Sequence, residues 1–424
     1  MRILLISSTF PYPPTLGGTE VRTFYLLRWL AQRHEVTLLT QRLSAIDFKA
    51  SPPGANPDAG GAGDAGDADI AALEALGAKV ICFPLGNSPR DTRLRKLGRL
   101  VRSHVQGIPP NVAFRYSPAL QAWVDDAVQR RQFDVLTCEH GVNAVYVRPD
   151  FPQQVRTVLN AHSFAVGWTR SQLALGASPH PWRDRLYLPT LRRYEQRFGR
   201  QFSRVVVTTA DDRQQFLSFI ARPPAAPNWV QVVPNGVDLA AFPPRDRDPG
   251  GQRLVFTGAM DADHNIDAVC FFVEAVLPLV RSRYSEVTFG IAGARPASAV
   301  QALSQHPGVQ VMGAVADMGA VLRQATVCVL PLRLGFGIKN KTLEAMAAGV
   351  PIVGSDRALE GLPMDASAPL ARRANTPLEY AEAIAQLLDS ADLRQRLSQQ
   401  ARAWVAAHYT WEHMGQRYEQ VLRC

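Results

Sequence analysis

The sequence contains no apolar run of about 18 residues, the length that a membrane-spanning helix needs, so a transmembrane segment is not expected. Its first residues, MRILLIS, have one charge and then an apolar stretch too short for a secretory signal peptide. Only five cysteines occur, an odd number at wide spacing, which indicates neither a disulfide framework nor a zinc site. We therefore expect reduced cysteines and a cytoplasmic protein.

Acidic residues are fewer than basic ones in the first half of the chain, whereas the second half is nearly balanced. The net charge is +9; residues 1–210 hold 26 Lys and Arg against 16 Asp and Glu, whereas residues 211–424 hold 20 against 21. Two segments are strongly basic, 90–103 and 183–200. They are either solvated helix faces or surfaces that attract an acidic acceptor or the inner face of a membrane. In the last case the protein would bind the membrane peripherally. No nucleic-acid recognition motif accompanies them, so nucleic acid is not an expected partner.

Short apolar segments alternate with amphipathic stretches along the chain, a pattern typical of parallel sheets covered by helices on both faces. At 424 residues the chain exceeds one ordinary core, and a Pro- and Gly-rich segment, 221–251, separates two series of apolar segments. We predict an α/β protein with two Rossmann-like domains, 1–225 and 226–405, and a terminal helix over 406–424; residues 51–69 are predicted to form a surface loop. The predicted strands are 2–7, 35–40, 79–83, 134–138, 156–160 and 204–209, then 253–258, 287–293, 309–313, 326–331 and 351–355.

Two glycines follow the first predicted strand and precede a helix expected from about Thr19. Gly17 and Gly18 would let backbone N–H groups approach a phosphate at the positive end of that helix; a simple turn is the alternative interpretation. The spacing is not the G-x-G-x-x-G of a dinucleotide site, so a nicotinamide dehydrogenase is not expected.

Histidines directly follow two of the predicted first-domain strands. The segment CEHGVN places Glu139 and His140 after one strand, and NAHSFA places His162 after another. Ligands of open α/β sheets bind at the carboxyl ends of the strands. A hydrogen-bonding loop residue explains each histidine by itself, but the two together indicate a polar site.

The stretch GFGIKNKTLEAMAAGVPIVGS, residues 335–355, places charges at the start of a helix expected from Thr342. The helix dipole disfavours Lys339 and Lys341 at that end, and a bound diphosphate would remove the conflict. Glu344 either caps the helix or accepts hydrogen bonds from a pair of sugar hydroxyls. We interpret this stretch as a ligand-binding element.

Three segments resemble glycosyltransferase family 4 in their order and residues: PYPPTLGGTEVRTFYLLRWLAQRHEVTLLT, VQVVPNGVDLAAF and LPLRLGFGIKNKTLEAMAAGVPIVGS. The resemblance spans nearly the whole chain. It implies a retaining, nucleotide-sugar-dependent enzyme of the GT-B fold, in which two Rossmann-like domains face a central cleft and C-terminal helices pack back toward the first domain. The segment MDADHNIDA, residues 260–268, is most similar to a bacterial branch associated with exopolysaccharide and exosortase-linked systems.

The resemblance also implies roles for the matching residues. Glycines and lysines would lie near the donor's phosphates, and Glu344 would hold the nucleotide ribose. The residues expected to bind the donor are Gly17, Gly18, Gly258, Lys339, Asn340, Lys341, Leu343 and Glu344. His162 would lie near the reacting sugar, and the expected catalytic residues are His162, Glu139 and His140.

Two positions depart from the family pattern. Phe336 stands eight residues before Glu344, where the family has the first of two glutamates, which serves the hydroxyls of the sugar. The loop after FTG, residues 256–258, lacks the usual Arg and Lys pair, which leaves Lys339 and Lys341 as the expected replacements.

These features predict a glycosyltransferase that moves a hexose-type sugar from a nucleotide-diphosphate donor to a hydroxyl of a saccharide or lipid-linked acceptor, in cell-surface or exopolysaccharide synthesis. Cations and helix ends would stabilise the leaving diphosphate, so no metal or other cofactor is expected. Closure about residues 221–251 would exclude water. Two alternatives stay open: a GT-B-type sugar-nucleotide epimerase, and a non-catalytic sugar-nucleotide-binding partner of an assembly complex.

Overall fold

The computed structural model describes residues 1–14, 17–42, 67–85, 107–176, 178, 180–220, 228–335, 337–364 and 369–423. Most of the predicted loop 51–69 and the whole basic segment 90–103 lie outside these residues. The chain forms two compact units: Met1–Val233 with Gly415–Cys424, and Pro234–Met414. The division falls inside the Pro- and Gly-rich segment, at Val233 where the sequence predicts residue 225. The last ten residues belong to the first unit.

The first unit contains a parallel sheet of seven strands among the described residues, in the order β3-β2-β1-β4-β5-β6-β7. Its central strand, β1, is buried on both faces, with residues 3–6 fully inaccessible, as expected for a strand covered by helices. The strands are β1 (Arg2–Ser7), β2 (Glu35–Arg42), β3 (Ala78–Pro84), β4 (Val135–Glu139), β5 (Arg156–Asn160), β6 (Arg204–Val207) and β7 (Val230–Val232).

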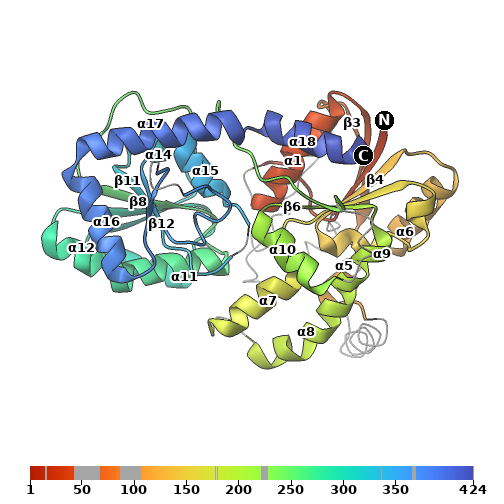
Figure 1. The fold of residues 1–424 in the computed structure, drawn as a ribbon, viewed down its shortest axis with the longest axis horizontal. Helices are drawn as coiled ribbons and strands as arrows, with labels where there is room; N and C mark the ends of the chain where they lie inside the picture. The colour runs from red at the N-terminus through yellow and green to blue at the C-terminus, as the bar shows by residue number, and fades with distance from the viewer. Residues whose placement is uncertain are drawn as a thin grey trace. The chain divides into compact units, whose positions relative to one another are not determined.

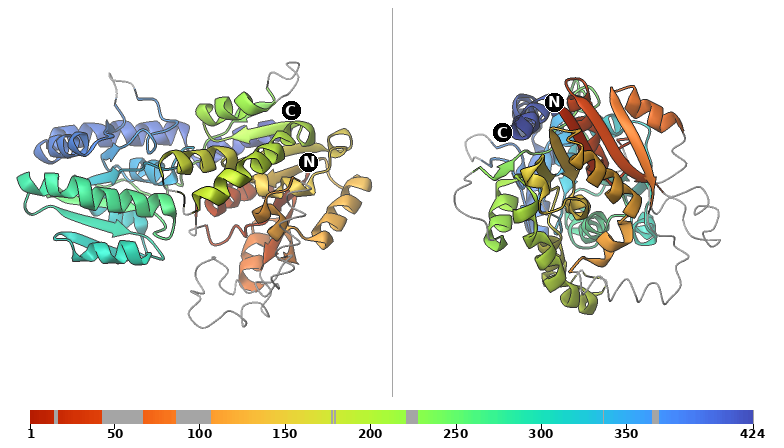
Figure 2. Two further views of the ribbon diagram at one scale, coloured as in Figure 1. Left: turned by 90° about the horizontal axis from the view of Figure 1, so that it is seen from below. Right: turned by 90° about the vertical axis from the view of Figure 1, so that its right-hand side faces the viewer.

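Helices connect these strands and cover the sheet (Figure 1). The N-terminal and C-terminal ends of the chain lie near one another in this unit (Figures 1 and 2), where His34 Nε2 lies 3.0 Å from Glu419 Oε1. The helices are α1 (Gly18–Ala31), α3 (Asp67–Glu74), α5 (Pro110–Arg115), α6 (Pro118–Gln129), η1 (Gly141–Tyr146), η2 (Phe151–Gln153), α7 (Ala165–Ala174), α8 (Pro181–Gln196), α9 (Phe198–Gln201), α10 (Ala210–Phe219) and, from Gly415, the end of α18 (Trp411–Arg423).

The second unit contains a parallel sheet of six strands in its described part, in the order β10-β9-β8-β11-β12-β13. The strands are β8 (Arg253–Thr257), β9 (Thr288–Ala292), β10 (Val309–Gly313), β11 (Val327–Leu330), β12 (Ile352–Gly354) and β13 (Arg372–Arg373). The helices are α11 (Asp263–Phe271), η3 (Phe272–Val276), α12 (Leu277–Arg283), α13 (Ser298–Ala302), η4 (Leu303–Gln305), α14 (Met318–Gln324), α15 (Asn340–Ala347), α16 (Pro377–Asp389) and α17 (Ala391–His408).

The predicted α/β architecture with two parallel sheets is confirmed, and every predicted strand is present. Two short strands were not predicted. The three residues of β7 lie in the Pro-rich segment, and the two of β13 are both arginines, so neither shows a recognisable hydrophobic pattern. In residues 265–280 the apolar side chains recur at helical spacing. The helix that this spacing indicates is interrupted by a π-helical turn, η3, just before Pro278, which has no N–H to donate into the preceding turn.

Candidate active site

The carboxyl ends of β4 and β5 hold a buried carboxylate in a polar network. Glu139 ends β4, Asn160 ends β5, and the two are register partners. Both side chains are fully buried. Asn160 Nδ2 donates to the two carboxylate oxygens of Glu139 at 2.9 and 3.1 Å, and His162 Nε2 lies 2.9 Å from Oε2. The structure thus brings together Glu139 and His162, which the sequence placed at separate strand ends.

His140 is held beside His162 in an unusual backbone conformation. Their ring centroids lie 5.4 Å apart, and His140 has a φ of 66°, which is uncommon for a residue other than glycine. Its N–H donates to the carbonyl oxygen of Asn160 at 2.9 Å. Burial lowers the pKa of His140 to about 3, and a positive charge on His162 or on Arg115 would act in the same direction. Burial also lowers the pKa of His162, although its hydrogen bond to Glu139 opposes the shift, so both shifts favour the uncharged form of the ring.

Helix α1 contributes two residues that the sequence reasoning missed. Arg22 is 1% exposed, and its guanidinium donates to Asn160 Oδ1 at 2.9 and 3.1 Å and to the carbonyl oxygen of Val233 at 2.9 Å. Thr23 Oγ1 donates to Glu139 Oε2 at 3.3 Å. A signal for Arg22 exists in the sequence: it occupies the same helical stripe as the buried Leu26 and Leu30, where a charge needs a buried partner.

Gly17 and Gly18 lie at the start of α1, as predicted, although the helix begins at Gly18 and not at Thr19. Gly17 is the N-cap residue and has extended backbone. A Cβ atom on Gly17 would lie 2.7 Å from Glu20 Oε2, so a carboxylate of the first turn covers this helix end. The predicted contact of these glycines with a donor phosphate concerns both units and stays a prediction.

In the second unit, Lys341 lies in the first turn of α15 beside the loop that follows β8. Its ammonium donates to Asn265 Oδ1 and lies 4.1 Å from the centroid of the Phe256 ring. Burial lowers the pKa of Lys341 to about 7, although the carboxylate of Glu344 opposes this shift. Burial likewise raises the pKa of Glu344 to about 7, opposed by Lys341. The carboxylate of Glu344 accepts no hydrogen bond from the described residues. The pair therefore changes its charge near neutral pH.

Gly258 lies where a side chain would displace Lys341. A Cβ on Gly258, whose φ is 150°, would lie 2.6 Å from Lys341 Nζ and 2.8 Å from Asn265 Nδ2. Gly293, which follows β9 with a φ of 155°, approaches the same loop: its Cβ would lie 1.7 Å from the carbonyl oxygen of Gly258. Two strand ends therefore meet here at backbone contact distance.

The side chains of the other predicted donor-binding residues of α15 and its N-cap already contact neighbouring residues of the second unit. Lys339, the N-cap of α15, donates to the carbonyl oxygen of Gly337 and lies 3.6 Å from Glu360 Oε2. Asn340 Oδ1 accepts from Asn235 at 2.7 Å. The Leu343 side chain is fully buried in the hydrophobic core of this unit, so its predicted donor contact can involve only its backbone.

The helix begins at Asn340 rather than at Thr342, so Lys339 is its N-cap residue and Lys341 lies inside its first turn. His264 faces the same charges: its pKa is lowered to about 3 by burial and by Lys341 and Lys339. Lys339 and Lys341 therefore both lie at the N-terminus of α15, the position where the dipole favours an anion.

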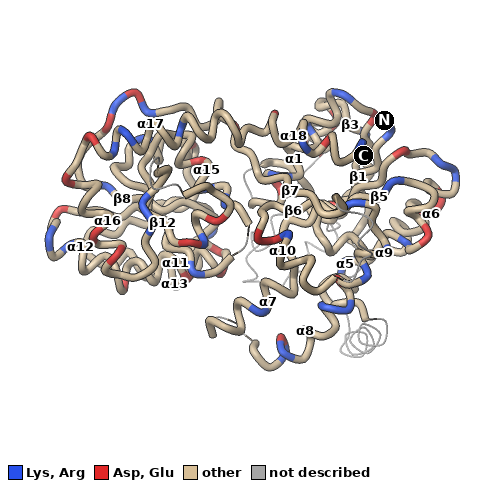
Figure 3. Tube along the Cα trace, viewed as in Figure 1, with Lys and Arg blue, Asp and Glu red and all other residues tan. Residues whose placement is uncertain are grey.

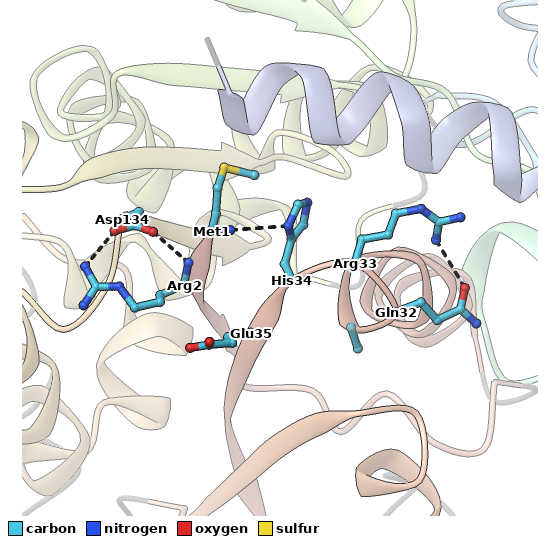
Figure 4. Close-up of a pocket in the computed structure, with 8 residues that line it drawn as sticks. Met1, Arg2, Gln32, Arg33, His34, Glu35 and Asp134 are labelled. Atoms are coloured by element: carbon cyan, nitrogen blue, oxygen red, sulfur yellow. Dashed lines mark hydrogen bonds and ion pairs between the residues drawn. The ribbon is translucent and has the colours of Figure 1, made fainter.

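A shallow pocket lies at the opposite, amino-terminal end of the first unit's sheet (Figure 4). Several of its polar groups are paired with one another: Arg2 Nη2 lies 2.7 Å from Asp134 Oδ1, and the Met1 amino group lies 3.5 Å from His34 Nδ1. None of the predicted site residues lines this pocket. We therefore place the candidate active site at the carboxyl ends of the strands and not here.

The described residues include no group of three or more His, Cys, Asp and Glu suited to hold a metal ion. In that part of the chain, no helix is both long and apolar enough to cross a bilayer.

Two family models match the chain in series. The model described as Glycosyltransferase Family 4 matches residues 70–241, and the model described as Glycosyl transferases group 1 matches residues 251–390. The first match lies largely in the first unit and the second lies within the second unit. No curated protein matches the chain significantly.

Solved glycosyltransferase structures share the fold over its full length. HepE from Anabaena, in complex with UDP and glucose, is 14% identical with a TM-score of 0.64, over 100% of this chain and 99% of that one. Sucrose-phosphate synthase from Thermosynechococcus elongatus is 17% identical with a TM-score of 0.68, over 100% and 98%. TarM from S. aureus, bound to UDP and other ligands, is 11% identical with a TM-score of 0.64, over 100% of both chains. At these identities the likeness shows the fold alone, which is GT-B.

Proposed function

Because the chain is a glycosyltransferase of the family 4 type with GT-B architecture, we propose that it transfers a hexose-type sugar from a nucleotide-diphosphate donor to a hydroxyl of a saccharide or lipid-linked acceptor. We further propose that transfer retains the anomeric configuration and serves cell-surface or exopolysaccharide synthesis. The likeness to HepE and TarM, whose structures contain UDP, supports a nucleotide-sugar donor.

The proposed position of the donor site rests on one observation. Lys341 and Glu344 lie one helical turn apart at the start of α15, and the ammonium of Lys341 lies beside the side-chain-free backbone of Gly258. A diphosphate placed there would meet a cation, the N–H groups of a helix end and a loop without side chains. Glu344 would accept hydrogen bonds from the ribose hydroxyls. As the sugar bond breaks, the diphosphate gains negative charge, which Lys341 would stabilise without any rearrangement.

The Glu139–His162 pair in the first unit would serve the acceptor side. The carboxylate accepts from His162 Nε2, so an uncharged His162 turns its other ring nitrogen, Nδ1, toward a ligand as an acceptor. A nitrogen held in this way can orient a sugar or acceptor hydroxyl, or take its proton. This pair and His140 are our proposed catalytic residues. No step of this scheme requires a metal or other cofactor.

A panel of UDP-, GDP-, ADP- and dTDP-sugars tests the function, with release of free nucleotide as the readout in the presence and absence of oligosaccharide acceptors. We expect turnover of one donor, lost in Lys341→Ala and Glu344→Ala and kept in the matched surface variants Lys79→Ala and Glu274→Ala, whose side chains are exposed. Interconversion of the sugar without an acceptor would instead identify an epimerase. Donor binding without any turnover would identify a non-catalytic partner.

We also propose peripheral contact with the inner face of a membrane, which would suit a lipid-linked acceptor. The basic segment 183–200 lies on α8 and α9 (Figure 3). Trp182 and Leu186, one turn apart on α8, are 86% and 64% exposed, beside the exposed Arg183 and Arg185. Aromatic and aliphatic side chains flanked by arginine suit an anionic lipid interface.

Sedimentation with phosphatidylglycerol vesicles tests this contact, with phosphatidylcholine vesicles for comparison. We expect salt-sensitive binding to the anionic vesicles that is weakened in Trp182→Ala/Leu186→Ala. Leu378→Ala is the matched control, because Leu378 is 66% exposed in the second unit. Absence of binding at low salt would refute the proposal.

A further inference from the structure

A charged side chain with almost no exposure sits behind the Glu139–His162 pair. Arg22 is 1% exposed, and it donates hydrogen bonds to Asn160 Oδ1 and to the carbonyl oxygen of Val233, which are both neutral acceptors. Burying a guanidinium costs several kcal/mol unless an opposite charge offsets it. Burial lowers the pKa of Arg22, and Glu139 is the nearby acidic group that opposes this shift most strongly.

Asn160 connects the two charges, and its amide orientation is fixed by them. A guanidinium only donates hydrogen bonds and a carboxylate only accepts them. Asn160 Oδ1 must therefore face Arg22, and Nδ2 must face Glu139, as the structure has them. A flipped amide would place two donors against each other on one side and two acceptors on the other.

The same polarity continues to His162. Glu139 Oε2 lies 2.9 Å from Asn160 Nδ2, 2.9 Å from His162 Nε2 and 3.3 Å from Thr23 Oγ1. An ionised carboxylate in this position requires the proton of His162 on Nε2, which leaves Nδ1 as an acceptor. The order of donation then runs from Arg22 to Asn160, from Asn160 to Glu139, and from His162 to Glu139.

We propose that Arg22 is a positioning residue: acting through Asn160 and Glu139, it fixes the tautomer and orientation of His162. The guanidinium also donates a hydrogen bond to the carbonyl oxygen of Val233, the residue at which the chain leaves the first unit. Its role in turnover rests on the proposed function, whereas its effect on the tautomer does not.

The tautomer is measured directly on the unmodified protein by NMR of ¹⁵N-histidine-labelled enzyme, with His162 assigned from a His162→Gln sample. The expected result is a proton on Nε2 and none on Nδ1 at neutral pH. A proton on Nδ1 instead would overturn the proposal without any activity measurement. Failure of the proposed function would show separately, as absence of nucleotide release from every donor.

Kinetics of UDP release from UDP-glucose test the route of the effect. Arg22→Met is expected to lower kcat on the order of 100-fold, the loss typical of a misplaced reacting group, while KM for the donor changes little. Arg22→Lys, which keeps the charge, is expected to recover part of kcat. In an Asn160→Ala background the effect of Arg22→Met on kcat should be smaller, because the hydrogen bonds that connect Arg22 to Glu139 through Asn160 are already absent. Additive losses in the double variant would contradict action through Asn160.

The pH profile separates positioning from a purely structural role. The charges that face His162 are Glu139 on β4 and Arg22 and Glu20 on α1, with the ring of His140 beside it. Arg22 lowers the pKa of His162, so its removal should move the acid limb of kcat to higher pH. Arg22→Lys should leave that limb in place. Loss of thermal stability with an unmoved acid limb would identify a structural residue only.

Discussion

The ammonium nitrogen of Lys341 lies 2.6 Å from the position that a Cβ atom on residue 258 would occupy. The two residues come from different elements, α15 and the loop after β8, and only glycine at 258 leaves room for the lysine at its present place. This close contact therefore places the two groups that a donor diphosphate needs side by side: the side-chain-free backbone of Gly258 and the ammonium of Lys341.

Gly258→Ala is expected to push the Lys341 ammonium away from its site. A hydrogen bond to a charged group contributes about 1.5–3 kcal/mol, so KM for the donor that the nucleotide-sugar panel identifies should rise about 10- to 100-fold. Steady-state kinetics measure this change. An unchanged KM in a folded Gly258→Ala protein would show that Lys341 does not contact the donor.

Donor affinity is expected to be highest near neutral pH. The pKa of Lys341, lowered to about 7, means that the free site loses its cation as pH rises above that value; the pKa of Glu344, raised to about 7, means that it loses its carboxylate as pH falls below it. Because the two groups interact, the limbs belong to the pair. Calorimetric titration, across this range, of the donor that the nucleotide-sugar panel identifies measures both limbs.

Two variants assign those limbs. Arginine stays charged throughout, so Lys341→Arg should flatten the alkaline limb, and Glu344→Gln should flatten the acid limb at a lower overall affinity. If the alkaline limb survives in Lys341→Arg, another group controls donor binding.

Gly293→Ala is expected to destabilise the second unit strongly. Its Cβ would lie 1.7 Å from the carbonyl oxygen of Gly258, at a φ of 155°, so the two strand ends must separate, at a cost of about 3 kcal/mol or more. Gly290→Ala on β9 is the matched control, because the nearest atom to its Cβ, Met312 Sδ, lies 3.4 Å away. Urea unfolding measures both; equal midpoints would contradict the predicted clash.

Glu195 is expected to make the first unit less stable as pH rises. Its Oε1 accepts from the N–H groups of Ala165 and Val166 at the start of α7, and burial raises its pKa to about 8. A raised pKa means that the folded state holds the proton, so stability is lost as pH climbs from the unfolded value, 4.5, through about 8.

Glu195→Gln keeps the acceptor and carries no charge, so it should melt higher than the parent at about pH 9 and close to it at about pH 5. Glu195→Ala removes the cap as well as the charge, so it should be about 1 kcal/mol less stable than Glu195→Gln at both pH values. Thermal unfolding followed by circular dichroism measures the three proteins. A Glu195→Gln protein that gains nothing at high pH would show that Glu195 is ionised in the fold.

The strands were predictable because each is a short apolar run ended by Gly, Pro or polar residues, and the histidines could be placed because they follow such runs directly. What joins them could not be predicted. Arg22 reaches Asn160 across 138 positions of sequence, and no local pattern encodes such a contact. Lys341 was identified from its conflict with the helix dipole, but its partner Asn265 lies 76 positions away. Leu343 was assigned to the donor site from its position in a motif, and that position does not reveal that its side chain belongs to the hydrophobic core.

The central claim is that the N-terminus of α15 binds the diphosphate of a nucleotide-sugar donor. Calorimetry of UDP, GDP, ADP and dTDP with the parent protein and with Lys341→Ala at neutral pH tests it most directly. The account predicts that one of these nucleotides binds the parent and that Lys341→Ala weakens its affinity at least about 10-fold, while Lys79→Ala leaves it unchanged. Equal affinity of that nucleotide for the parent and Lys341→Ala, or binding of none of the four, would contradict the account.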